Sequence, residues 1–129
     1  MAVSKKEEHY SLIRAVRYAL AGLRYILGHE LNARIHLAVA ILVLLAGVLL
    51  GLTNTELAAI FFAVLLVFLA EILNSAVEKM LDLIKPEHSA EVKLVKDMAA
   101  GAVLVAAVGS FLLGVAIFFP VILEKLWAR

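Results

Sequence analysis

The chain has 129 residues, of which 64% are hydrophobic and 18% are charged, and its net charge is +1. A soluble domain is about half apolar and a quarter charged, so this excess of apolar residues predicts a protein solvated by lipid. The small net charge gives no reason to expect a nucleic-acid partner. The absence of cysteine excludes disulfides, thiolate nucleophiles and cysteine-based zinc sites in this sequence.

The first segment, residues 5–29, has the pattern of an amphipathic helix. Its arginines fall largely outside the apolar face, which predicts a helix on the inner membrane surface with the arginines toward anionic headgroups. The segment has no uninterrupted apolar stretch of the kind that a cleaved signal peptide needs. Apolar residues recur here at spacings of three and four: Leu12, Ala15, Val16, Ala19, Leu20 and Leu23.

Three long apolar runs follow, at residues 35–52, 57–73 and 99–123, and among them only the second carries an acidic residue, Glu71. A membrane-spanning helix needs about 20 apolar residues. Buried helices of a soluble bundle are the poorer interpretation, because the third run has no polar face to meet water. We therefore expect one all-α integral membrane domain over residues 1–129, with the surface helix at about 5–29 and transmembrane helices at about 33–52, 56–84 and 95–123.

Lysine and arginine are distributed unevenly among the connections. They are frequent before the first run and in the second connection, but residues 51–56 contain none. Because positive residues stay on the cytoplasmic side, we expect the N-terminus and the second connection in the cytoplasm of a bacterial inner membrane. Three spans then place the C-terminus outside, although Lys125 and Arg129 run against the rule.

Polar residues continue the second run along one face. Glu71, Asn74, Glu78 and Asp82 are spaced by three, four and four, so they lie within an arc of roughly 80° on a helix. Charged groups within a span are costly and normally face a bundle interior or a wet cavity. Carboxylates on one face also repel one another, unless a divalent cation or a lysine such as Lys96 joins them.

Glu30, Lys96 and Asp97 are expected at the same membrane level, because each directly precedes a span. Carboxylates for magnesium, a lysine for phosphate and a deeper carboxylate as base are the parts that phosphoryl transfer needs. The sequence has neither a GxxxxGK[ST] loop nor a GxGxxG loop. Two alternatives stay open at this point: a small cation-coupled membrane carrier, and a structural module in which polar side chains hold helices together.

Two segments carry a resemblance to a known family. Residues 70–82 read AEILNSAVEKMLD and residues 96–103 read KDMAAGAV. They resemble the signature segments of the prokaryotic diacylglycerol kinase family, small three-span lipid kinases that include undecaprenol kinases. The match extends upstream through residues 22–24 and Glu30. It implies ATP as the phosphoryl donor, Mg²⁺ as the cofactor, and a homotrimer whose active sites are shared between neighbouring chains.

The resemblance also implies roles for individual residues. Glu71 corresponds to the general base that deprotonates the lipid hydroxyl, and Asn74 and Asp82 correspond to supporting polar positions. The implied metal carboxylates are Glu30 and Glu78. The residues implied in nucleotide binding are Tyr18, Glu30, Glu78, His88, Lys96 and Asp97, with Lys96 neutralising phosphate and His88 in the loop over the adenosine.

Some positions depart from the diacylglycerol-preferring pattern. Ser11 stands where an arginine is expected, with Arg14 close by, and His36 stands where that branch has a glutamate. The AAGAV segment and the IFFP ending resemble the branch whose favoured acceptor is undecaprenol. We therefore expect an ATP-dependent undecaprenol kinase, with a diacylglycerol kinase that makes phosphatidic acid as the alternative.

Overall fold

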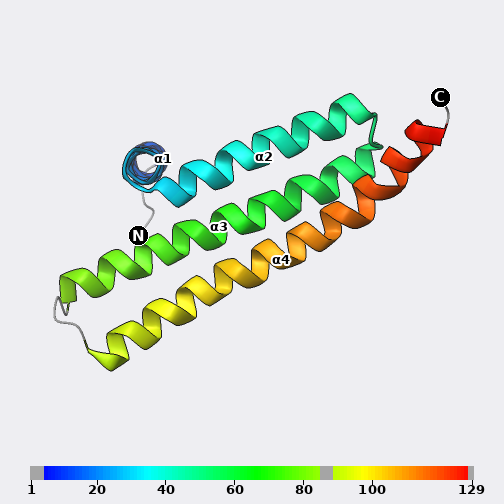
Figure 1. Ribbon diagram of the computed structural model, residues 1–129. Helices are drawn as coiled ribbons and strands as arrows, with labels where there is room; N and C mark the ends of the chain where they lie inside the picture. The colour runs from blue at the N-terminus through cyan, green and yellow to red at the C-terminus, as the bar shows by residue number, and fades with distance from the viewer. Residues whose placement is uncertain (1–4, 85–88, 128–129) are drawn as a thin grey trace. The chain divides into compact units, whose positions relative to one another are not determined.

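The structure is a computed structural model that describes residues 5–84 and 89–127, with side chains from residue 11 onward. Its secondary structure consists of four helices: α1 (Lys5–His29), α2 (Leu31–Leu50), α3 (Asn54–Ile84) and α4 (Ala90–Trp127) (Figure 1). The chain forms two compact units that divide between Leu31 and Asn32, so α1 belongs to the first unit and α2–α4 to the second.

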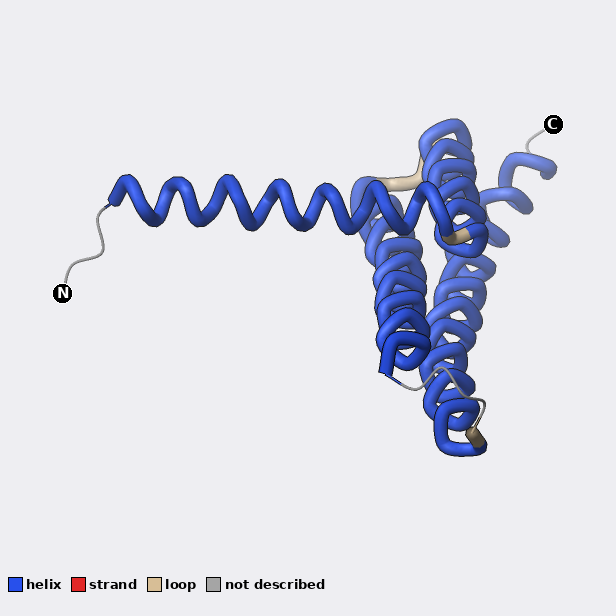
Figure 2. Tube along the Cα trace, turned by 90° about the vertical axis from the view of Figure 1, so that its left-hand side faces the viewer, coloured by secondary structure: helices blue, strands red, loops and turns tan. Residues whose placement is uncertain are grey.

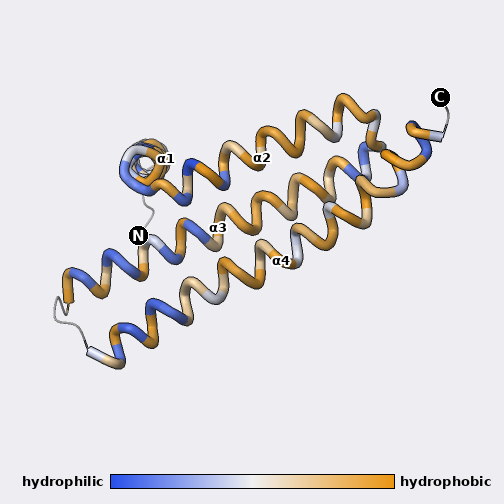
Figure 3. Tube along the Cα trace, viewed as in Figure 1, coloured by the Kyte–Doolittle hydropathy of each residue, from blue (hydrophilic) through white to orange (hydrophobic). Residues whose placement is uncertain are grey.

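The three helices of the second unit are long and apolar enough to cross a membrane, with mean hydropathies of 2.4, 2.5 and 2.6 in their most apolar windows. This confirms an all-α protein with three candidate spans. Figure 3 shows hydrophobic residues along most of α2–α4 and hydrophilic ones where α3 ends and α4 begins. At 31 residues, α3 is about 46 Å long. It therefore exceeds a hydrocarbon layer of about 30 Å, and its polar end extends beyond it.

Helices α3 and α4 form the principal helix–helix contact, and α2 runs alongside them (Figure 2). One face of α3 carries most of the buried side chains, because buried residues recur there every three or four positions. In the apolar part of this pair, the Ser110 hydroxyl of α4 donates a hydrogen bond to the Ala63 carbonyl of α3 over 2.9 Å. The buried residues of α3 are Ile60, Ala63, Val67, Glu71, Asn74 and Ser75.

The turn between α2 and α3 is fixed by local hydrogen bonds. Gly51 has a φ of 73°, and the Leu52 N–H donates to the Gly47 carbonyl over 3.0 Å, as in a glycine-terminated helix. Thr53 then caps α3. The Glu56 carboxylate accepts a hydrogen bond from the Thr53 N–H at 2.8 Å, and the Thr53 hydroxyl oxygen accepts one from the Glu56 N–H at 3.3 Å, which together form a capping box.

Gly47 lies where this turn folds back on α2. A Cβ at this position would lie 2.9 Å from Leu57 Cδ2 and 3.0 Å from Leu52 Cδ1. We expect Gly47→Val to lower the free energy of unfolding by about 1–3 kcal/mol, because the added methyl groups overpack the turn. Unfolding followed by circular dichroism in detergent measures this.

Gly109→Val is the matched control, because a Cβ on Gly109 meets no described atom within 4 Å. Equal stability of the two variants would show that close approach at Gly47 does not hold the turn.

Candidate active site

The polar stripe of α3 changes from buried to exposed along the helix. Glu71 is 3% exposed and Asn74 is 7% exposed, whereas Glu78 is half-buried and Asp82 is exposed. Their spacing on one continuous helix produces this order, since each step of three or four residues advances about one turn toward the polar end of α3. Glu71 is therefore the acidic group closest to the apolar part of the bundle.

Glu71 is a carboxyl group with little contact to other polar groups. Within residues 5–84 and 89–127, no hydrogen bond or ion pair to its side chain is found. A buried carboxyl without a protein partner has oxygens available to a hydroxyl group that enters the bundle. This property suits a general base.

Asn74 connects the buried and the half-buried parts of the stripe. Its amide nitrogen donates to Glu78 Oε1 over 3.2 Å, which holds that carboxylate toward the helix. Its own oxygen, Oδ1, is buried and accepts no hydrogen bond from the part of the chain that the structure describes. A buried amide oxygen normally has a donor, so Oδ1 is available to a donor that comes from outside this chain.

Lys96 joins α4 to the exposed end of the stripe. Its ammonium group lies 2.6 Å from Asp82 Oδ1, across the connection between the two helices. Both side chains are substantially exposed, so the pair contributes at most about 1 kcal/mol to stability. It does fix the position of a cation that carries three N–H donors, of which Asp82 takes one. Asp97 follows on α4 and is exposed.

The remaining candidate residues lie in the first unit or outside the described residues. Tyr18 is an exposed residue of α1, and the Glu30 N–H donates to the Ile26 carbonyl over 2.8 Å directly after that helix. Their place beside the carboxylates of α3 stays a prediction. His88 lies outside the described residues.

Comparison with known proteins identifies the family. Residues 17–118 match the profile of the family described as prokaryotic diacylglycerol kinase, and every candidate site residue lies within this segment. The chain belongs to this family. The resemblance of the two signature segments to this family is confirmed.

Two curated relatives of this chain are named for different acceptor lipids. A diacylglycerol kinase from Synechocystis sp. is 36% identical over 88% of this chain and 66% of its own length, just under two thirds. An undecaprenol kinase from Bacillus subtilis is 43% identical over 70% of this chain and 74% of its own length. The names of these two relatives therefore do not decide between undecaprenol and diacylglycerol as the acceptor.

The α3 carboxylates of this family member do not form a closed metal site within one chain. Among the described residues, no group of three His, Asp or Glu side chains is placed to hold a metal ion. Magnesium in phosphoryl-transfer sites is commonly held by one or two carboxylates together with substrate phosphates and water. Glu78, half-buried and oriented by Asn74, fits that kind of ligand.

Two features of the site region were not predicted from the sequence. The Ser110 hydroxyl joins α4 to α3, and the only signal for it is a lone hydroxyl in an otherwise apolar run. His36 lines an apolar cavity in the bundle, and its sequence signal is a single imidazole at the start of the first span.

Proposed function

We propose that this protein is an ATP-dependent kinase that transfers the γ-phosphoryl group to a membrane lipid alcohol, with undecaprenol as the preferred acceptor. The observation that supports it most is the buried Glu71 carboxyl, placed at the boundary between the apolar bundle and the polar end of α3. A base at this depth meets a hydroxyl group that arrives from the lipid.

In the proposed reaction, Glu71 takes the proton of the lipid hydroxyl as that oxygen bonds to the γ-phosphorus. The bond from the γ-phosphorus to the bridging oxygen breaks, and ADP leaves with the electron pair. Lys96, held by Asp82, offsets the negative charge of the phosphates. The Asn74 Oδ1 atom is positioned to accept a hydrogen bond from the incoming hydroxyl or a bound water.

Glu78 and Glu30 would hold Mg²⁺ that enters with the nucleotide. The metal, when bound, neutralises charge on the β- and γ-phosphates. Tyr18, His88 and Asp97 would complete the nucleotide site. We also propose, on the family resemblance, a homotrimer in which neighbouring chains share each site.

The orientation follows from the positive-inside rule. We propose a multi-pass protein of the bacterial inner membrane, with its N-terminus and the α3–α4 connection in the cytoplasm, where ATP is available. The single membrane domain over residues 1–129 and the membrane-surface position of α1 are part of this proposal.

A competition experiment between undecaprenol and diacylglycerol tests the proposed choice of acceptor. The undecaprenol kinase relative is the more identical of the two, at 43% against 36%, and supports undecaprenol. The diacylglycerol kinase relative supports the second candidate. Purified protein in lipid, given ATP and magnesium with equal amounts of undecaprenol and diacylglycerol, should form mainly undecaprenyl phosphate. Predominant phosphatidic acid would instead establish the diacylglycerol kinase.

A further inference from the structure

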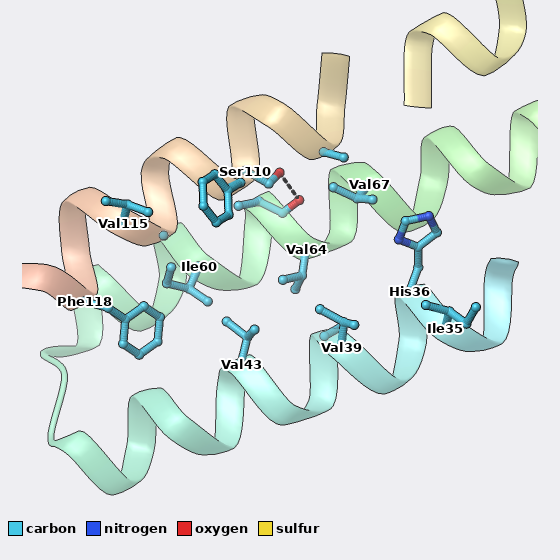
Figure 4. A pocket seen from close by; sticks show the side chains of 15 residues that line it. Ile35, His36, Val39, Val43, Ile60, Val64, Val67, Ser110, Val115 and Phe118 are labelled. Carbon is cyan, nitrogen blue, oxygen red and sulfur yellow. Dashed lines mark hydrogen bonds between the residues drawn. The ribbon is translucent and has the colours of Figure 1, made fainter. Parts of the chain in front are cut away.

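The turn between α2 and α3 marks one boundary of the apolar layer. Helix α2 has 20 residues and is about 30 Å long, which matches the thickness of a hydrocarbon layer. The turn at residues 51–53 follows α2 directly and therefore lies at one face of the membrane. The hydrogen bond from the Ser110 hydroxyl to the Ala63 carbonyl, the dashed line in Figure 4, fixes the level of α4 relative to this turn.

The end of α4 extends past this boundary. Helix α4 runs antiparallel to α3 (Figure 1), so equal steps from the hydrogen-bonded pair reach equal levels. Ala63 lies nine residues after Asn54, where α3 begins, and Phe119 lies nine residues after Ser110. Phe119 is therefore level with the start of α3. Residues 121–127, which we call the terminal segment, would extend about 10 Å beyond it if α4 stayed straight.

Pro120 stands at this boundary, inside α4. A proline has no N–H to donate to the carbonyl four residues earlier, which is that of Ala116, and its ring clashes with that carbonyl, so a helix bends at such a position. Figure 1 shows the last turns of α4 leaving the line of the rest of the helix. The terminal segment therefore has a direction of its own.

The terminal segment is amphipathic. At about 100° per residue, exposed apolar side chains fall within an arc of roughly 140°, whereas Glu124 and Lys125 lie on the opposite side. Such a division between an apolar and a charged face is typical of a helix in the plane of the membrane interface. The residues of this apolar arc are Phe119, Ile122, Leu123, Leu126 and Trp127.

The apolar arc does not pack on the rest of the bundle. Figure 4 shows Phe118 beside the cavity among α2, α3 and α4, whereas its neighbour Phe119 is 60% exposed. Trp127 is 87% exposed, and no side chain of residues 122–127 is buried by the part of the chain that the structure describes. The arc is therefore free to contact what surrounds the protein at this level.

The chemistry of the segment fits a lipid interface. An indole has an apolar ring and one N–H donor, so tryptophan is enriched where acyl chains meet headgroups. Lys125 lies beside the arc, and its ammonium group can extend to lipid phosphates. The family match ends at residue 118 and contains every candidate site residue, so the terminal segment is not needed to complete the active site.

We propose that the terminal segment is a membrane-interface anchor. Pro120 turns the end of α4 into the boundary between headgroups and acyl chains, with the apolar arc against the acyl chains and Glu124 toward water. The partner is the lipid surface at the face of the membrane where the α2–α3 turn lies. The anchor fixes the depth of α4 in the bilayer and does not depend on the proposed kinase function.

The fluorescence of Trp127 tests this placement, because it is the only tryptophan in the sequence. The protein is placed in phosphatidylcholine nanodiscs, where both faces are open to iodide, without ATP or acceptor. Lipid brominated near the headgroup should quench Trp127 at least about twofold more than lipid brominated at the chain ends, and iodide should quench it little. Quenching mainly by iodide, mainly by the chain-end bromines, or by neither would overturn the anchor, since these indicate water, a straight span or a protein contact.

Two substitutions to glutamine distinguish the apolar arc from the charged face. Leu126→Gln removes apolar area from the arc and should lower quenching by headgroup-level bromine by about half. Glu124→Gln is the matched control on the opposite side and should not change it. Equal quenching in the two variants would overturn the role of the arc.

Pro120→Ala tests the bend. Alanine restores the hydrogen bond to the Ala116 carbonyl, so α4 should continue straight and carry Trp127 about 10 Å farther from the boundary. We expect iodide quenching of Trp127 to rise and quenching by brominated lipid to fall. Unchanged quenching by both would show that Pro120 does not direct the terminal segment into the interface.

Discussion

Replacing Glu71 by glutamine is expected to lower the rate of lipid phosphorylation by about 10²–10⁴-fold while MgATP still binds. The substitution keeps the size of a side chain that is 3% exposed, but it removes the only group at this depth of α3 that can accept a proton. The Lys96–Asp82 pair that is proposed to contact phosphate is left unchanged. Turnover with undecaprenol and calorimetric titration with MgATP measure the two effects separately.

Glu124→Gln is the matched control for this substitution. Glu124 is an exposed residue near the end of α4, away from the stripe, so the same change there should leave turnover near the wild-type rate. A Glu71→Gln variant that phosphorylates lipid as fast as the control would exclude Glu71 as the base.

Glu78→Gln is expected to act on the nucleotide. The glutamine can still accept the Asn74 hydrogen bond, which is 3.2 Å long in the wild type, but it loses the charge that would hold magnesium on the phosphates. We expect the KM for MgATP to rise at least tenfold, since a charged ligand of the metal is lost, while the KM for the lipid changes little. Initial rates measured at varied MgATP concentration and at varied lipid concentration give the two KM values separately.

Asp82→Asn provides a comparison on the same face of α3. It weakens an exposed ion pair with Lys96, so its effect on the KM for MgATP should be several-fold smaller. An unchanged nucleotide affinity in Glu78→Gln would contradict the proposed metal role of Glu78.

The polar stripe was largely predictable because helical periodicity determines which residues share one face of a helix. Spacings of three and four place Glu71, Asn74, Glu78 and Asp82 on one side of any helix that continues past the apolar run, and α3 does continue to Ile84. Hydropathy identifies only the apolar part of a helix and not its polar ends. Helix α4, from Ala90 to Trp127, therefore extends beyond both ends of the expected span of about 95–123.

The pairings within the site required the three-dimensional structure. The sequence named Lys96 as a lysine that could join the stripe, but its pairing with Asp82 in particular depends on how α3 and α4 lie against each other. The cavity also depends on tertiary packing, because its walls come from three helices. The capping box of Thr53 and Glu56 differs, since its threonine and glutamate are three residues apart and could have been read from the sequence.

One measurement tests the central claim most directly: transfer of radioactive γ-phosphate from ATP to undecaprenol by the purified chain in sealed lipid vesicles. The proposed function predicts labelled undecaprenyl phosphate that requires magnesium and is lost in Glu71→Gln. No labelled lipid from either undecaprenol or diacylglycerol, together with a cation flux through the vesicles that consumes no ATP, would contradict it and favour a carrier.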